Sequence, residues 1–144
     1  MRFNVRVYGL LIHEDHILVT DENRFNTQFT KFPGGGLEFE EGILDCLKRE
    51  FQEELQIEIH SPQLFYINED FVVSAFRKED QILSIYYFVA CDQTEKIETK
   101  EKAFDFKGEE QIFRWIHLNN LNSDEFRFPI DKIVVGKLAE FYNS

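Results

Sequence analysis

Three glutamates close together in the chain could jointly bind a divalent cation. Glu50, Glu53 and Glu54 fall in a segment with helical spacing of its apolar residues, and residues three and four apart share one face of a helix. Carboxylates held so close repel one another, which costs stability. A hard cation such as Mg²⁺ offsets the repulsion, because it takes oxygen ligands and keeps waters and substrate phosphates in its shell. The spacing therefore predicts a divalent-metal site.

A glycine triplet, Gly34–Gly36, precedes these acids and would let the backbone approach a ligand closely. Taken alone, three glycines are typical of a plain turn, and a row of glutamates is typical of a solvated helix face. The two features together, in this order and at this spacing, favour a metal site beside a tight loop.

The spacing closely resembles the Nudix box. That signature reads Gly, five residues, Glu, seven residues, Arg-Glu-aliphatic-any-Glu-Glu-any-Gly-aliphatic, and here it runs from Gly35 to Ile57. Its places are filled by Gly35, Glu41, Arg49, Glu50, Phe51, Glu53, Glu54, Gln56 and Ile57. Phe51 replaces the usual aliphatic residue, which is a mild change. Gln56 replaces a glycine that normally ends the helix in a left-handed conformation, so either it bears a cost of about 1 kcal/mol or the helix ends differently.

The resemblance assigns roles to the residues of the box. Glu53 and Glu54 match the main ligand positions for Mg²⁺ or Mn²⁺, and Glu50 is a further ligand or the general base. The backbone carbonyl of Gly34 would be another ligand. Arg49 would pair with the acids and orient them rather than hold substrate, and Glu38 and Glu41 would be supporting acids.

Beyond the box, the resemblance implies that a loop acid before a late strand supplies a metal ligand or the general base. Glu109 is the first candidate and Glu110 the second. An exposed acidic loop without a catalytic role is the open alternative. The histidines at 13, 16, 60 and 117 have no metal-ligand spacing and are interpreted as structural or surface residues.

Substrate contacts are less specific in the sequence. The candidates for phosphate contacts are Arg24, Lys31 and Arg77, and those for base stacking are Phe71, Phe76 and Tyr86. Surface charge for the cations, and core packing for any one ring among 16 phenylalanines, are the alternatives. Asp131 is placed like a base-contacting residue of some nucleotide-cleansing relatives, but we favour a plain carboxylate at a helix start.

Composition narrows the class of protein. The chain of 144 residues suits a single domain over residues 1–144. Its formal net charge of −11 argues against a broad nucleic-acid surface. No apolar run is long enough to span a membrane, and no signal peptide is apparent. Cys46 and Cys91 favour two buried free thiols over a disulfide, in keeping with a cytoplasmic location.

The apolar pattern predicts the elements that position the site. Strands are expected over 5–12 and 16–20, joined as a hairpin, and over 57–59, 63–67, 71–73, 82–90 and 112–116. Residues 21–30 are expected to be a loop. Helices are expected from 44 to 55, with Leu44, Leu47, Phe51 and Leu55 facing the core, and from 129 to 142. On the second, Ile130, Ile133, Val134, Leu138 and Phe141 share one side. The class is α/β, and the resemblance implies a Nudix-type α/β/α sandwich with a central mixed β-sheet.

The predicted function is metal-dependent hydrolysis of the pyrophosphate linkage of a nucleoside diphosphate derivative, a (deoxy)nucleoside triphosphate included. Glu50 or Glu109 would remove the proton from the attacking water. The main rival is a catalytically silent Nudix-fold nucleotide-binding or sensor module, and a diphosphate isomerase of the same superfamily is a third reading. The expected partner is a small nucleotide rather than a membrane, and monomer and homodimer both stay open.

Overall fold

The computed structural model describes residues 1–143. Its strands are β1 (Arg2–His13), β2 (His16–Arg24), β3 (Thr27–Lys31), β4 (Gly34–Gly36), β5 (Ile59–Ile67), β6 (Asp80–Cys91) and β7 (Gln111–His117). The helices are α1 (Ile43–Leu55) and α2 (Pro129–Asn143), with short 3₁₀ turns η1 (Thr94–Lys96), η2 (Leu118–Asn120) and η3 (Ser123–Glu125).

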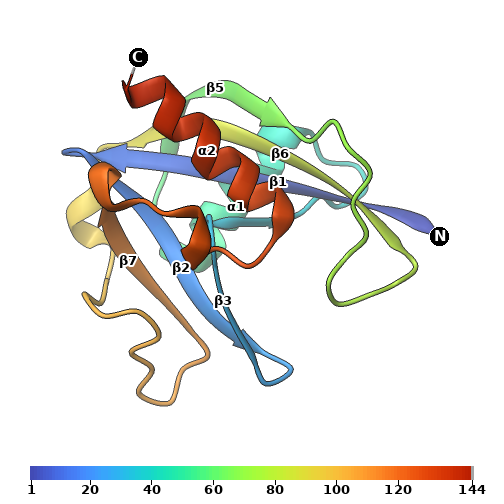
Figure 1. Ribbon diagram of the computed structural model, residues 1–144. Helices are drawn as coiled ribbons and strands as arrows, with labels where there is room; N and C mark the ends of the chain where they lie inside the picture. Colours follow the sequence, from blue (N-terminus) through green and yellow to red (C-terminus); the bar gives the residue numbers. More distant parts are fainter. Residues whose placement is uncertain (144) are drawn as a thin grey trace.

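The strands form one mixed sheet. Its main order is β3-β2-β1-β6-β5, with β4 paired to β1 and β7 paired to β2. β1 and β6 run parallel, whereas the other pairs are antiparallel. α2 crosses one face of the sheet and α1 lies on the other (Figure 1). The α/β class and the mixed central sheet predicted from the sequence are confirmed.

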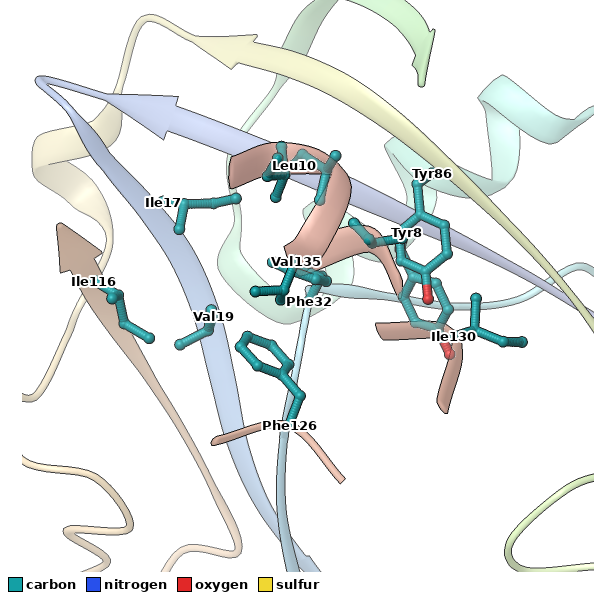
Figure 2. Packing of buried hydrophobic residues seen from close by; sticks show 12 residues of the cluster. Tyr8, Leu10, Ile17, Val19, Phe32, Tyr86, Ile116, Phe126, Ile130 and Val135 are labelled. Carbon is teal, nitrogen blue, oxygen red and sulfur yellow. The ribbon is translucent and has the colours of Figure 1, made fainter. Parts of the chain in front are cut away.

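β1 is buried on both faces, as its apolar pattern indicates. Val7 and Leu11 pack in the cluster that contains the apolar side of α1. Tyr8 and Leu10 pack in the cluster that contains α2 (Figure 2). Successive strand residues point to opposite faces, so β1 connects both helical layers and fixes their relative position.

The predicted β1–β2 hairpin is correct only near its turn. The two strands pair at Ile12↔Ile17 and His13↔His16. Beyond these pairs they diverge, because β1 pairs with β4 and β6 while β2 pairs with β3 and β7. The divergence matters for the site, since β4 reaches β1 in the space that opens between the two strands.

The prediction of a loop over residues 21–30 was wrong. β2 continues to Arg24 and β3 begins at Thr27, so only Phe25 and Asn26 form the turn. Both turn residues have positive φ, 53° and 58°, which suits a two-residue hairpin connection. Three of the polar residues that suggested a loop, Asp21, Glu22 and Thr30, are buried in the sheet, where Asp21 is fully enclosed and bonded to other side chains.

Three other expectations about strands also need correction. The glycines 34–36 form strand β4 instead of breaking regular structure. β5 is one strand from Ile59, with irregular pairing around Pro62, rather than two strands at 57–59 and 63–67. Residues 71–73 form no strand, and only Val73 makes an isolated bridge, to Gln81. Local apolar runs did not reveal which backbone groups would find a partner.

The helices match their predicted ranges within a residue, with some differences in burial. In α1, Leu44 is 38% exposed, and Cys46 takes the buried position instead. In α2, Ile133 and Phe141 are 36% and 57% exposed, while Val135 is buried. Both cysteines are free, but Cys91 is only partly buried. Among residues 1–143, no helix is long and apolar enough to cross a membrane.

Candidate active site

α1 presents the box acids because its opposite side is buried. Leu47, Phe51 and Leu55 pack against the sheet, so the glutamates between them point away from this core. Asp45 accepts a hydrogen bond of 3.3 Å from the backbone N–H of Gly42 at the start of the helix. The charge of Asp45 also suits the positive end of the helix dipole.

Arg49 is the centre of a network of charged groups. Its Nε and Nη2 donate to both carboxylate oxygens of Glu41, at 3.0 and 2.8 Å. Its Nη1 donates to Glu50 at 3.1 Å and to Glu53 at 3.3 Å. Nη2 also donates to the carbonyl of Gly36 at 3.1 Å. The guanidinium therefore joins the helix to the glycine segment and sets the directions of the acids.

The electrostatics of this network agree with its geometry. The hydrogen bonds from Arg49 lower the pKa of Glu41 to about 2, and in return Glu41 raises the pKa of Arg49 above its ordinary value. Burial raises the pKa of the Cys46 thiol to about 12, so this cysteine stays protonated. It is no candidate for a nucleophile.

Glu54 differs from its neighbours in having a buried carboxylate oxygen, Oε2, without a hydrogen-bond partner among the described residues. Burial raises the pKa of Glu54 to about 7, opposed by the charge of Lys31 and reinforced by Glu50 and Glu22. A buried carboxylate oxygen without a partner is costly. It is therefore the side chain in this cluster that most needs a cation.

The glycine segment is shaped around one of the acids. A Cβ at Gly35 would overlap the carboxylate of Glu50, and a Cβ at Gly34 would overlap the backbone of β1. Gly34 also has a φ of 147°, which an L side chain rarely adopts. Only glycine at both places allows the segment to lie between β1 and the acids.

These donors fit a hard divalent cation in their chemistry. They comprise the unpartnered Glu54 oxygen, the Glu50 and Glu53 carboxylates and the carbonyl of Gly34, and Mg²⁺ and Mn²⁺ favour such oxygen ligands. Among residues 1–143, no three acidic, histidine or cysteine side chains are already gathered as a ligand set. Arg49 binds Glu50 and Glu53 at 3.1 and 3.3 Å, so both carboxylates would have to turn toward a cation.

The structure adds Glu22 and Gln111, which the sequence did not indicate as site residues, and pairs Glu22 with Lys31, a predicted phosphate contact. Lys31 is 6% exposed, and its Nζ lies 3.2 Å from Oε2 of Glu22, which is 8% exposed. Gln111 of β7 donates to the same oxygen at 3.3 Å. Glu22 was assigned to a loop, and only pairing of β2 with β3 and β7 brings it beside the box acids. No local signal in the sequence marks it.

Glu109 is not brought to the box acids. It is exposed, and its carboxylate accepts a hydrogen bond from the backbone N–H of Lys107 in its own loop. Glu110, the second candidate, is exposed too, and its carbonyl accepts from the N–H of Asn23. In this structure Gln111, next along the chain, is the residue from this segment that reaches the acids.

A cavity of about 620 Å³ meets the acid cluster at Lys31, which lines the cavity, whereas none of the box glutamates does. Its volume suits a small organic ligand. Five of the six predicted substrate contacts line it, namely Arg24, Lys31, Arg77, Phe76 and Tyr86. Phe71 does not line it and is 64% exposed. The loop carrying Phe71 and Phe76 forms no strand. Its side chains therefore do not alternate between two faces, and the sequence could not predict which of them would face the cavity.

Asp131 forms part of the inner wall of this cavity. It is 3% exposed and accepts a hydrogen bond of 2.6 Å from the Tyr86 hydroxyl. Burial raises the pKa of Asp131 to about 6, although the bond from Tyr86 lowers it. The residue does sit at the start of α2, as expected, but it faces the cavity rather than solvent.

The sequence matches the family model of the NUDIX domain over residues 2–135. The chain belongs to the Nudix family. Family membership agrees with the box register and supports a pyrophosphohydrolase.

Individual relatives are distant. An 8-oxo-dGTP diphosphatase of Buchnera aphidicola subsp. Schizaphis graminum is 24% identical over 136 residues, covering 93% of this chain and 92% of that protein. A MutT Nudix hydrolase from Burkholderia pseudomallei superposes with a TM-score of 0.69 at 15% identity, covering 94% of this chain and 98% of that one. A MutT structure from work on Aliivibrio salmonicida and Vibrio cholerae gives 0.65 at 20% identity, with 96% and 98% covered. These superpositions establish the Nudix fold.

Proposed function

We propose that this Nudix protein hydrolyses the pyrophosphate linkage of a nucleoside triphosphate with the help of Mg²⁺ or Mn²⁺. The observation that carries the proposal is the position of Lys31. Its side chain lines the cavity, while its Nζ contacts Glu22 at 3.2 Å and the carbonyl of Gly34 at 3.5 Å. Lys31 thus lies between the cavity and the acids, as expected if the nucleobase binds in the cavity and the phosphates bind beside the acids.

Each part of the site would have a separate task. The cavity holds the nucleoside, with Tyr86, Phe76 and Arg24 in its wall. Glu50, Glu53, Glu54 and the carbonyl of Gly34 would hold the cation, which neutralises phosphate charge and helps to activate water. Arg49 keeps the acids oriented. Glu50 is a better placed general base than Glu109, because Glu50 lies within the acid cluster around Arg49, whereas Glu109 is bonded within its own loop.

The relative that is an 8-oxo-dGTP diphosphatase makes purine triphosphates, normal and oxidised, the first substrates to test. Asp131 could accept hydrogen bonds from the N–H groups of a purine in the cavity. We therefore propose that the protein is a nucleotide-cleansing enzyme of the cytoplasm.

The test is phosphate release from a panel of nucleotides, with and without Mg²⁺, in the presence of inorganic pyrophosphatase. Glu53→Gln and Glu54→Gln should lower kcat at least about a hundredfold, since each removes a ligand for the cation. Glu58→Gln, an exposed acid just beyond α1, is the matched control and should keep the wild-type rate. Nucleotide binding without hydrolysis of any panel member would instead support the silent binding module.

A further inference from the structure

The cations that line the cavity differ in their partners. Arg2 forms an ion pair of 2.7 Å with Asp80. The guanidinium of Arg24 stacks on the Phe25 and Phe76 rings, 5.7 and 5.6 Å from their centroids. Lys31, as described above, is paired with a glutamate, and Arg77 is exposed to solvent. Each of these charges therefore has a carboxylate, an aromatic ring or water to stabilise it.

Arg6 of β1 differs from the other four because it is partly buried and has no carboxylate partner in the described part of the chain. Its guanidinium lies 5.7 Å from the centroid of the Tyr8 ring, and its Nε donates to the Tyr8 hydroxyl at 2.8 Å. Within residues 1–143 it forms no ion pair, although the chain has 27 acidic residues. A partly buried charge is normally paired. The Nη1 and Nη2 groups of Arg6 thus remain as a planar fork, a shape that matches two oxygens of a phosphate.

The position of Arg6 is between the box acids and the inner wall of the cavity. It lies opposite Gly36 in the pairing of β1 with β4, and its Nη1 is 3.6 Å from where a Gly36 Cβ would stand. On one side it is close enough to Glu50 for that carboxylate to raise the pKa of Arg6, although Tyr8 has the larger effect. On the other side it lines the same cavity as Asp131.

We infer that Arg6 binds, through Nη1 and Nη2, the phosphate that stays attached to the nucleoside in the cavity. The inference rests on the proposed function and deepens it, because it makes the esterified phosphate a recognised part of the substrate. Tyr8 is a positioning residue in this arrangement. Its hydroxyl fixes Nε and so directs the free edge of the guanidinium, while its ring lies under both Arg6 and Lys31, at 5.7 and 5.4 Å from its centroid.

The experiment measures binding without turnover. Nucleoside monophosphates (dAMP, dGMP, dCMP, dTMP and 8-oxo-dGMP) and their free nucleosides are titrated calorimetrically into the full chain in EDTA. For the nucleoside that binds, we expect the monophosphate to bind about tenfold to a hundredfold more tightly, the effect of a charge-assisted hydrogen-bonded pair. Arg6→Gln should reduce that preference to less than about threefold.

Further variants separate recognition from folding. Arg6→Lys keeps the charge but loses the fork, so its preference should be intermediate, and Tyr8→Phe should weaken the preference without abolishing it. Arg127→Gln is the matched control, because Arg127 is an exposed arginine that does not line this cavity, and it should keep the wild-type preference. Near-ultraviolet circular dichroism checks that each variant is folded.

Two results would overturn the inference: no monophosphate binding more tightly than its nucleoside, or a full preference retained in folded Arg6→Gln and Arg6→Lys. The proposed hydrolysis is tested separately from the role of Arg6. Metal-dependent turnover with an unchanged preference would remove only the role of Arg6. A preference lost in Arg6→Gln, in a protein that hydrolyses no nucleotide, would remove only the enzymatic function.

Discussion

Asp131 shows how burial changes the chemistry of a single residue. A carboxylate at the start of a helix is ordinarily solvated and ionised. Here the cavity wall encloses it, and the hydrogen bond of 2.6 Å from Tyr86 satisfies one of its oxygens. The cost of ionising it in this setting is expressed in its raised pKa of about 6.

The raised pKa of Asp131 predicts that Asp131→Asn becomes more stable relative to wild type as the pH rises. Because the pKa rises from 3.8 in the unfolded chain to about 6 in the folded one, the native state holds the extra proton between these values. The contribution of Asp131 to stability therefore falls as pH rises from about 4 to 6. The variant lacks this loss, so its free energy of unfolding relative to wild type should grow by up to about 3 kcal/mol between pH 4 and pH 7.

Urea unfolding of both proteins at pH 4, 5, 6 and 7 measures this difference, and groups common to both cancel. Tyr86→Phe provides a second comparison, because it removes the hydrogen bond that lowers the pKa of Asp131 and should enlarge the pH dependence. A difference between wild type and Asp131→Asn that stays constant with pH would show that Asp131 titrates normally.

At the scale of elements, the end of α1 shows how a departure from the box is accommodated. Gln56 adopts the left-handed conformation that the usual glycine would take, with φ 53° and ψ 40°. Its backbone N–H donates to the carbonyl of Gln52 at 3.0 Å, and its side chain donates to that of Glu53 at 2.8 Å. The helix therefore ends as in the family pattern, and a side-chain bond offsets part of the strain.

Two substitutions should separate the strain from the bond. Gln56→Gly removes the left-handed strain and should raise the free energy of unfolding by about 0.5–1 kcal/mol. Gln56→Ala keeps the strain and loses the bond to Glu53, so it should be less stable than wild type. Urea unfolding gives the order, and an alanine variant as stable as wild type would show that the side-chain bond contributes nothing.

The β2–β7 pair depends on a buried ion pair. Arg114 donates to both oxygens of Asp21, at 2.7 and 3.1 Å. Thr30 donates to Asp21 at 2.6 Å, and the backbone N–H of Phe104 donates at 3.2 Å. One carboxylate thus links β2, β3, β7 and the loop before β7, and holds the strand that carries Glu22.

Asp21→Asn should destabilise the protein by up to about 3–5 kcal/mol, because the buried Arg114 would lose its bidentate counter-charge and keep only the longer contact with Glu125, at 3.6 Å. Chemical denaturation measures the loss. Asp92→Asn is the control, since Asp92 pairs with His60 at the surface, and it should change stability by less than about 1 kcal/mol. Equal effects of the two substitutions would contradict the assignment of Asp21 as the linking group.

At the scale of the whole molecule, the site depends on how closely α1 approaches the sheet. A Cβ on Gly9 of β1 would lie 2.5 Å from the ring of Phe51. Because α1 carries the box acids and β1 carries Arg6 and Tyr8, this contact sets the distance between the acids and the cavity. Packing of one ring against one glycine therefore affects both parts of the site.

Gly9→Ala should cost about 1–3 kcal/mol through overpacking and should also lower kcat, since α1 must shift. Thermal unfolding and the hydrolysis assay measure the two effects, and adding Phe51→Leu should restore part of each. Gly136→Ala in α2 meets no atom within 4 Å and should instead stabilise by up to about 1 kcal/mol. Unaltered stability of Gly9→Ala would mean that the sheet and helix separate without strain.

The sequence by itself determined the features that depend on local spacing. The box register, the extents of both helices and the two-faced burial of β1 follow from periods of 3.6 and 2 and from the order of glycines and acids. These patterns identified the family and the mixed α/β class, and both were confirmed. Even Gln56 could be located as the unusual position, because the helix end is a local structure.

Only the tertiary structure decided which distant polar groups meet. Glu22 and Lys31 look like loop charges in the sequence, yet pairing of β2 with β3 and β7 buries them beside the box acids. The same pairing leaves Glu109 outside the cluster, and the close approach of β4 to β1 places Arg6 at the cavity. The physical reason is that a buried charge is tolerated only with a partner, and here those partners come from segments far apart in the chain, which no local pattern records.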